Sequence, residues 1–238
     1  MTTKIKARLI GITQPVDPEI KGPEGLIAYC ARISNPDNQL NPEFSKLMDY
    51  CIRNKHWSIF QLCNAVVAIE APRDITRQFT RHSSLYTPGD PFEAPGFNLE
   101  YGGVQEFSQR YSDEIEFTDR DFRRQDTKNR QNSIDDYNPE LKELLSQLVA
   151  QTIKGSKDVY LGLRSKELDV AKECARVILP EGLTMSSLTV NATVRSWLHY
   201  LDVRDDPGVT QWEHVLLARE IRKVLEPAFP TIFGVKND

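Results

Sequence analysis

The chain has 238 residues and a net charge of -4, and its 39% hydrophobic and 27% charged residues are typical of a soluble globular protein. The acidic balance argues against a general nucleic-acid-binding surface, so a phosphate site would have to be built locally. The N-terminus has no apolar signal segment, and no stretch approaches the roughly 20 apolar residues that span a bilayer. The four cysteines form no Cys-x-x-Cys pair and are predicted to be buried, reduced thiols. We therefore expect a protein of the cytoplasm that binds neither nucleic acid nor membranes.

In the N-terminal half, hydrophobic periodicity predicts a strand, two short helices, a second strand and a third helix, in that order. The first strand covers 6–13, and the two helices begin near Pro23 and Pro42. The β-branched run 65–70 is typical of a buried strand, and a helical pattern resumes over 74–81.

The middle of the chain is predicted to be largely irregular. The segment 84–103 is rich in Pro and Gly and is expected to be a loop insert, which in a compact domain is usually functional or mobile. A short strand is expected over 114–117. The polar segment 120–138 is interpreted as a solvated connection, because its acids offset its bases and it lacks interleaved aromatic residues.

The C-terminal half is predicted to be mainly helical. The expected elements are a long amphipathic helix from Pro139, a helix over 168–179, a strand over 183–190 and helices over 194–203 and 212–225. The pattern contains no repeat and no second domain. Helices packed on a small, mostly antiparallel sheet give an α+β fold, in a single domain over 1–238.

The densest group of chemically active side chains lies between Gln105 and Tyr111. Glu106, Ser108 and Arg110 place an acid, a hydroxyl and a guanidinium close together in the sequence. We expect this group to be buried, and a small anionic ligand is one of the few partners that can satisfy it. No base and orienting acid accompany Ser108 in a recognisable arrangement, so it is predicted to orient a ligand and not to attack it.

Further polar side chains fall at positions that suit a ligand as well as a structural role. His56 follows a predicted helix, where a histidine is more often a cap or a surface group than a ligand. Arg176 would neutralise a helix C-terminus, but its planar fork also suits phosphate oxygens. Arg195 and His199 lie four residues apart on one helical face, which by itself is also typical of a surface helix.

Taken in order, these segments resemble the flavin-dependent thymidylate synthases, from about residue 26 to about residue 229, and phage-like members in particular. The family signature is an Arg-His-Arg followed closely by a Ser-x-Arg. Ser108 and Arg110 complete its second half, whereas Ser83 replaces the last arginine of its first half and the insert 84–103 lengthens the gap. Gln61 stands where the family has a glutamate.

The resemblance implies a homotetramer whose active sites lie between subunits. FAD, reduced by NADPH, would then serve the methylation of dUMP to dTMP, with methylenetetrahydrofolate as the carbon donor. The catalytic positions that it implies are Ser108 and Arg204. Those that it implies for substrate binding are Gln78, Glu106, Ser108, Gln109, Arg110, Arg176 and Arg204. Those that it implies for the cofactor are His56, Ser58, Gln61, Arg81, His82, Asn191, Arg195 and His199. No metal site is expected, because the histidines lack ligand spacing.

Two alternatives to this function remain open. Because Ser83, Gln61 and the insert all fall in the implied cofactor region, the chain could instead modify another pyrimidine nucleotide, such as dCMP, or deliver a hydroxymethyl group. It could also be a relative that binds flavin or nucleotide but has lost turnover. The identity of the product distinguishes the three functions.

Overall fold

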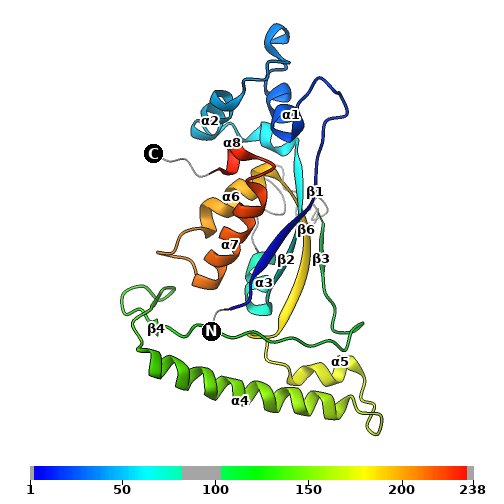
Figure 1. The fold of residues 1–238 in the computed structure, drawn as a ribbon, viewed down its shortest axis with the longest axis vertical. Coiled ribbons are helices and arrows are strands. Elements are labelled where there is room, and N and C mark those ends of the chain that lie inside the picture. Colours follow the sequence, from blue (N-terminus) through cyan, green and yellow to red (C-terminus); the bar gives the residue numbers. More distant parts are fainter. Residues whose placement is uncertain (1–2, 82–102, 235–238) are drawn as a thin grey trace, which may run out of the picture.

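The computed structural model describes residues 3–81 and 103–234, and the main sheet within them has four antiparallel strands. Across the sheet the order is β1 (Lys6–Ile12), β2 (Asn64–Pro72), β6 (Met185–Thr193) and β3 (Val104–Glu106). Helices cover one face of this sheet (Figure 1). The predicted α+β class, with a small antiparallel sheet, is therefore confirmed.

The helical elements range from single turns to one long helix. Their bounds are α1 (Gly22–Ala31), η1 (Pro36–Asn38), α2 (Ser45–Arg53), η2 (Trp57–Gln61), α3 (Arg73–Thr80), α4 (Pro139–Leu163), α5 (Lys172–Ala175), η4 (Arg176–Ile178), α6 (Val194–Arg204), α7 (Trp212–Leu225) and α8 (Pro230–Phe233). The Asn138 side chain caps α4 by accepting from the amide of Leu141, and Thr193 caps α6 by accepting from that of Ser196. Among the described helices, none combines the length and apolar character needed to cross a membrane.

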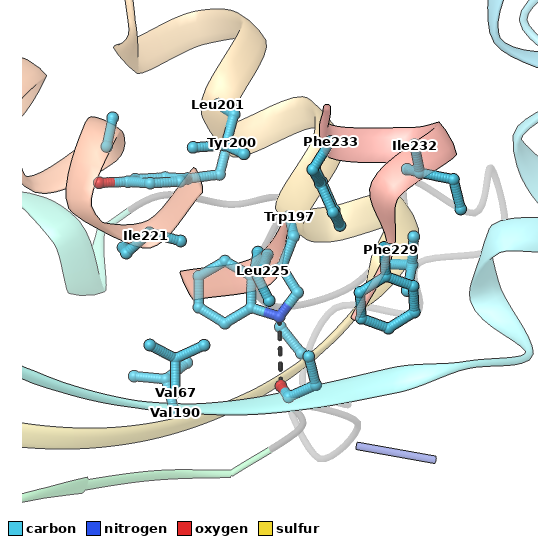
Figure 2. Close-up of a cluster of buried hydrophobic side chains, with 14 of the residues drawn as sticks. Val67, Val190, Trp197, Tyr200, Leu201, Ile221, Leu225, Phe229, Ile232 and Phe233 are labelled. Atoms are coloured by element: carbon cyan, nitrogen blue, oxygen red, sulfur yellow. Dashed lines mark hydrogen bonds between the residues drawn. The ribbon is translucent and has the colours of Figure 1, made fainter. Parts of the chain in front are cut away.

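The alternation of side chains along β2 explains how the sheet buries one face. Ala65, Val67 and Ile69 are buried, whereas the residues between them are only partly covered on the opposite face. The buried side chains pack beneath α6 and α7, where Trp197 is fully buried (Figure 2). Its indole Nε1 donates a hydrogen bond to the Ala65 carbonyl at 3.2 Å, so this large core side chain leaves no polar group unpaired.

Some predicted elements are wrong in their extent. The helix expected over 168–179 is reduced to α5 and η4, because Asp169 has a positive φ of 40° that an α-helix does not tolerate. The strand expected over 114–117 is reduced to a single bridge, between Phe117 and Thr184. The sequence pattern also does not predict β3 or α8, since elements of 3 and 4 residues are too short to show a period.

The segment 120–138 is not a solvated connection throughout. It contains the antiparallel pair β4 (Arg124–Gln125) and β5 (Ser133–Ile134). The side chains of Arg120 and Arg123 turn inward and are 13% and 10% exposed. The polar composition of the segment therefore reflects buried ion pairs as well as solvated groups.

The cysteine and insert predictions have mixed outcomes. Cys51 and Cys63 are buried and free, as expected, and Cys30 is half-buried. The prediction of a buried thiol is wrong for Cys174, because the short helix α5 that carries it lies at the surface. Of the predicted loop insert, residues 84–102 lie outside the described residues.

Glu24 on α1, near the N-terminus, binds α8 near the C-terminus. It is 5% exposed, and its carboxylate accepts hydrogen bonds from the backbone amides of Thr231 and Ile232 at 2.8 and 3.0 Å. These amides lie in the first turn of α8, where a helix has no acceptors of its own. Burial raises the pKa of Glu24, and the hydrogen bonds from Thr231 and Ile232 only partly oppose this shift. The acceptor oxygen of Glu24 thus holds α8 in place, whereas burial makes the ionised form of the carboxylate unfavourable.

We expect Glu24→Ala to lower the free energy of unfolding by about 1–3 kcal/mol and Glu24→Gln to change it little, because glutamine keeps an acceptor for the two amides. A raised folded pKa means that the folded state binds the proton more readily than the unfolded state. The contribution of Glu24 to stability therefore falls as the pH rises from about 4.3 through the raised value. In urea unfolding at pH 5 and pH 8, the free energy of unfolding of Glu24→Gln should rise relative to that of the wild type at the higher pH. Equal losses in both variants would show that the charge, not the acceptor, matters.

Candidate active site

The pairing of β3 with β6 places Glu106 at the edge of the sheet between two polar partners. Just beyond it, the amide of Phe107 donates to the Ser187 carbonyl at 2.8 Å. One oxygen of Glu106 accepts from Ser186 Oγ at 2.9 Å, and the other lies 3.4 Å from the guanidinium of Arg77. The carboxylate is therefore held in one orientation by a strand and a helix.

Beyond Phe107 the chain leaves the sheet and turns from Ser108 to Tyr111. The amide of Tyr111 donates to the Ser108 carbonyl at 3.1 Å, and the amide of Arg110 donates to Ser108 Oγ at 3.3 Å. Gln109 is buried, but the Arg110 side chain is 60% exposed and Tyr111 is 85% exposed. The prediction of a buried cluster is therefore wrong for Arg110 and Tyr111, since a turn that has left the sheet directs side chains outward.

This turn lies against α5, which brings Arg110 toward Arg176. Lys172 Nζ on α5 donates to the Tyr111 carbonyl at 3.2 Å, and Glu173 lies 3.7 Å from the Arg110 guanidinium. Arg176 begins η4 directly after α5 and is half-buried, with no ion pair to any residue in the described part of the chain. An exposed ion pair such as that of Arg110 contributes little, so both guanidinium groups are available to an anion.

A second group of predicted substrate residues lies where α6 ends and α7 begins. Gln78 on α3 donates through Nε2 to Oε1 of Gln211, which directly precedes α7, at 2.8 Å. Arg204 is the last residue of α6. In the segment that joins α6 to α7, Thr210 Oγ1 donates a hydrogen bond to the Val203 carbonyl at 3.3 Å. Arg204 Nε is buried and has no hydrogen-bond partner among the described residues. A buried guanidinium nitrogen in this state suits an oxygen atom of a ligand.

Three of the predicted cofactor residues gather near the end of the sheet where β2 begins and β6 ends. η2, which ends at Gln61, packs against α6, which carries Arg195 in its first turn. Asn191, near the end of β6, has a buried Oδ1 without a hydrogen-bond partner in the ranges 3–81 and 103–234. Arg195 is half-buried and forms no ion pair with any described residue. An orphaned acceptor near the end of β6 and a cation without an ion pair to the described residues in the first turn of α6 are therefore four residues apart in the sequence.

The other predicted cofactor residues that the structure describes lie at its surface. His56 and Ser58 are exposed at the start of η2, and His199 is exposed on α6. Arg81 directly follows α3 and is also exposed. His82 lies outside the described residues.

Within one copy of the chain, the predicted substrate residue Arg176 and the predicted cofactor residue Arg195 are not brought together, although the predicted cofactor residue Arg81 lies only three positions beyond Gln78. β6 has 9 residues and is therefore about 26–30 Å long. Arg176 precedes this strand and Arg195 follows it, and the elements that carry them lie toward opposite ends of the sheet (Figure 1).

Glu213 on α7 is a fully buried charge near the site that no local sequence pattern indicates. Arg123 donates to one of its oxygens at 2.6 Å, and Arg120 lies 3.2 Å from the other. Gln211 Nε2 also donates to Glu213, at 3.0 Å. Burial by itself would raise the pKa of Glu213, but Arg123 and Arg120 outweigh it and hold the pKa below its usual value. Local sequence patterns do not predict this network, because Arg123 and Glu213 are 90 residues apart.

These features define a class, namely an α+β protein that presents cationic and amide side chains to anionic ligands at two separate places on one sheet. Residues 16–231 match the protein family described as thymidylate synthase complementing protein. The chain is 42% identical over 228 residues to the flavin-dependent thymidylate synthase of Synechocystis sp., an alignment that covers 94% of this chain and 96% of that protein.

More distant relatives agree with this match. The chain is 36% identical over 230 residues to a probable flavin-dependent thymidylate synthase of Paramecium bursaria Chlorella virus 1, covering 96% of this chain and 97% of the relative. It is 29% identical over 220 residues to the flavin-dependent thymidylate synthase of Thermosipho melanesiensis, covering 90% and 86%. The chain belongs to the flavin-dependent thymidylate synthase family. This membership confirms the predicted family and the prediction of an enzyme with a flavin cofactor.

Proposed function

We propose that this chain methylates dUMP to dTMP, with FAD as its cofactor, methylenetetrahydrofolate as the carbon donor and NADPH as the reductant. The observation that carries the proposal is the placement of Arg110 and Arg176 on adjacent elements beside the Ser108 turn. Two planar guanidinium groups match the oxygens of a nucleotide monophosphate. The similarity to flavin-dependent thymidylate synthases over most of the chain supports the same reaction.

In the proposed nucleotide site, Arg110 and Arg176 hold the phosphate, and Ser108 orients the nucleotide through its hydroxyl group. Buried Gln109 anchors the turn that carries Ser108 and Arg110. Glu106 can only accept when ionised, so it suits a hydroxyl group of the substrate. Arg204, with its buried Nε, stabilises the negative charge that develops on the uracil oxygens during the reaction.

The residues at the end of β6 and the start of α6 fit a flavin dinucleotide. Asn191 Oδ1 is a buried acceptor that suits a donor group of the flavin, and Arg195 suits its phosphates. The remaining members of this proposed site are His56, Ser58, Gln61, Arg81, His82 and His199. When bound, FAD supplies the hydride that the reaction requires. The side chains hold the cofactor and substrate in a reactive orientation, which is the main catalytic contribution open to them.

A homotetramer with active sites between subunits unites the two groups of residues. Because Arg176 and Arg195 lie beyond opposite ends of β6, a single chain leaves each group without the other. Leu144 and Leu148 on α4 are each 53% exposed, and a neighbouring subunit would cover this apolar surface. We also propose that 1–238 forms one domain with the fold of this family, in the cytoplasm of a bacterium or of a phage-infected host.

Product analysis tests this function. Purified protein is incubated with FAD, NADPH, methylenetetrahydrofolate and either dUMP or dCMP, and the nucleotides are identified by mass spectrometry. We expect dTMP from dUMP and no product when the folate is omitted. A product from dCMP, or a hydroxymethylated nucleotide, would contradict this proposal in favour of an altered reaction. Retained FAD without any product would favour a binding protein that has lost turnover.

A further inference from the structure

Gln78 is held by a chain of hydrogen bonds that ends at a buried carboxylate. Its Nε2 donates to Gln211 Oε1 at 2.8 Å, and Gln211 Nε2 donates to Glu213 Oε2 at 3.0 Å. Glu213 is fully buried and is fixed in turn by Arg123 at 2.6 Å and Arg120 at 3.2 Å. Gln78, at one end of this network, is one of the residues predicted to bind the substrate, and we place it in the proposed nucleotide site. Glu213, at the other end, is fully buried.

The direction of these hydrogen bonds follows from the chemistry of Glu213. An ionised carboxylate accepts hydrogen bonds and cannot donate them, so Gln211 must turn its NH2 group toward Glu213. The carbonyl oxygen of Gln211 then faces Gln78, which must offer an N–H group in return. The two guanidinium groups keep Glu213 ionised. The side-chain amides of Gln78 and Gln211 therefore cannot exchange the positions of their oxygen and NH2 group without losing a hydrogen bond. The side-chain oxygen Oε1 of Gln78 is left as an acceptor, with no partner among the described residues.

We propose that Gln211 and Glu213 are positioning residues that fix the Gln78 amide so that its carbonyl oxygen accepts a hydrogen bond from the nucleotide. This inference rests on the proposed function. The phosphate is bound through its acceptor oxygens, which the side-chain oxygen of Gln78 would repel. The donors that dUMP offers are the N3–H group of its base and the 3′-hydroxyl of its sugar. Gln78 therefore contacts one of these two groups, whereas Arg110 and Arg176 bind the phosphate.

A fixed acceptor also bears on the choice of base. Uracil carries a donor at N3, where cytosine carries an acceptor. An amide that is free to rotate can match either base, but an amide whose NH2 group is held by Gln211 offers only its oxygen, which matches the donor. A contact between Gln78 and N3 would thus favour dUMP over dCMP, which is the distinction that the proposed function requires.

A double-mutant cycle tests whether Gln211 acts through Gln78. In the protein loaded with FAD, Gln211→Ala is expected to weaken dUMP binding about 3- to 10-fold by calorimetry, the effect of one net hydrogen bond. In a Gln78→Ala background the same change is expected to have less than about a twofold effect. If the alanine variant does not fold, Gln211→Met keeps the side-chain length without its hydrogen bonds. Gln131→Ala, at an exposed position, is the matched control. Additive effects of the Gln78 and Gln211 changes would overturn the proposal.

Three nucleotides then identify the donor. The loss of affinity caused by Gln78→Ala is compared for dUMP, dCMP and 2′,3′-dideoxyuridine monophosphate. A loss that disappears with dCMP assigns the contact to N3–H, and one that disappears with the dideoxy nucleotide assigns it to the 3′-hydroxyl, so either result supports the proposal. An equal loss with all three, which share only the phosphate as a common charged group, would overturn it. A wild-type protein that binds no dUMP would instead overturn the proposed function, so the two failures are distinguishable.

Discussion

Replacing Arg176 by alanine is expected to weaken dUMP binding about 10- to 150-fold, while FAD binding changes by less than about twofold. Arg176 is half-buried and forms no ion pair with the described residues, so its guanidinium is available to the phosphate. A charge-assisted hydrogen bond of this kind contributes about 1.5–3 kcal/mol. Calorimetric titration of the purified protein with dUMP and, separately, with FAD measures both affinities.

Two controls show whether this effect comes from the phosphate. Deoxyuridine, which lacks the phosphate, should bind the Arg176→Ala variant and the wild type equally. Arg130→Ala removes an exposed guanidinium between β4 and β5 and should leave dUMP binding unchanged. If nucleotide and FAD affinity fell together, Arg176 would not be the phosphate ligand that we propose.

Glu213→Ala is expected to lower the free energy of unfolding by about 3–5 kcal/mol, because it leaves the buried guanidinium groups of Arg120 and Arg123 without their shared carboxylate. The matched control on the same helix is Glu220→Ala. Among the residues that the structure describes, Glu220 pairs only with Lys223, at 3.7 Å on the surface, so its removal should change stability by at most about 1 kcal/mol. Chemical unfolding at pH 7 gives both values, and a similar small loss in the two variants would contradict the role of Glu213.

The effect of Glu213 should also depend on pH. Its folded pKa is lowered, so its contribution is fully present above the usual value of about 4.3 and is lost as the pH falls through the lowered folded value. The difference in unfolding free energy between the wild type and Glu213→Ala should therefore narrow below about pH 4. A difference that stays constant down to the lowest pH at which the protein folds would mean that packing, and not charge, accounts for it.

Long and strongly patterned elements can be predicted from local sequence. The helix predicted over 212–225 coincides with α7, and the strand predicted over 65–70 lies within β2. Periodicity works here because each element buries one face, and its residues report that burial directly. The family can also be predicted from residue type and spacing, because several segments, among them that of Ser108 and Arg110, occur in the order typical of it.

Contacts between distant segments could not be predicted in this way. β3 has 3 residues and is held by β6, where the bond from Ser186 to Glu106 spans 80 residues of sequence. The sequence predicts Arg110 to be part of a buried cluster, but its side chain is exposed because the turn from Ser108 to Tyr111 leaves the sheet after β3.

The sequence by itself determined the family, the types of the long elements and the residues that are candidates for ligand binding. Only the tertiary structure decided which of them meet and how they are oriented. Gln78 illustrates the difference, because the direction of its amide depends on Gln211 and on the charge of Glu213. A buried carboxylate is stable only when the fold brings its partners to it, and Arg123 comes from 90 residues away.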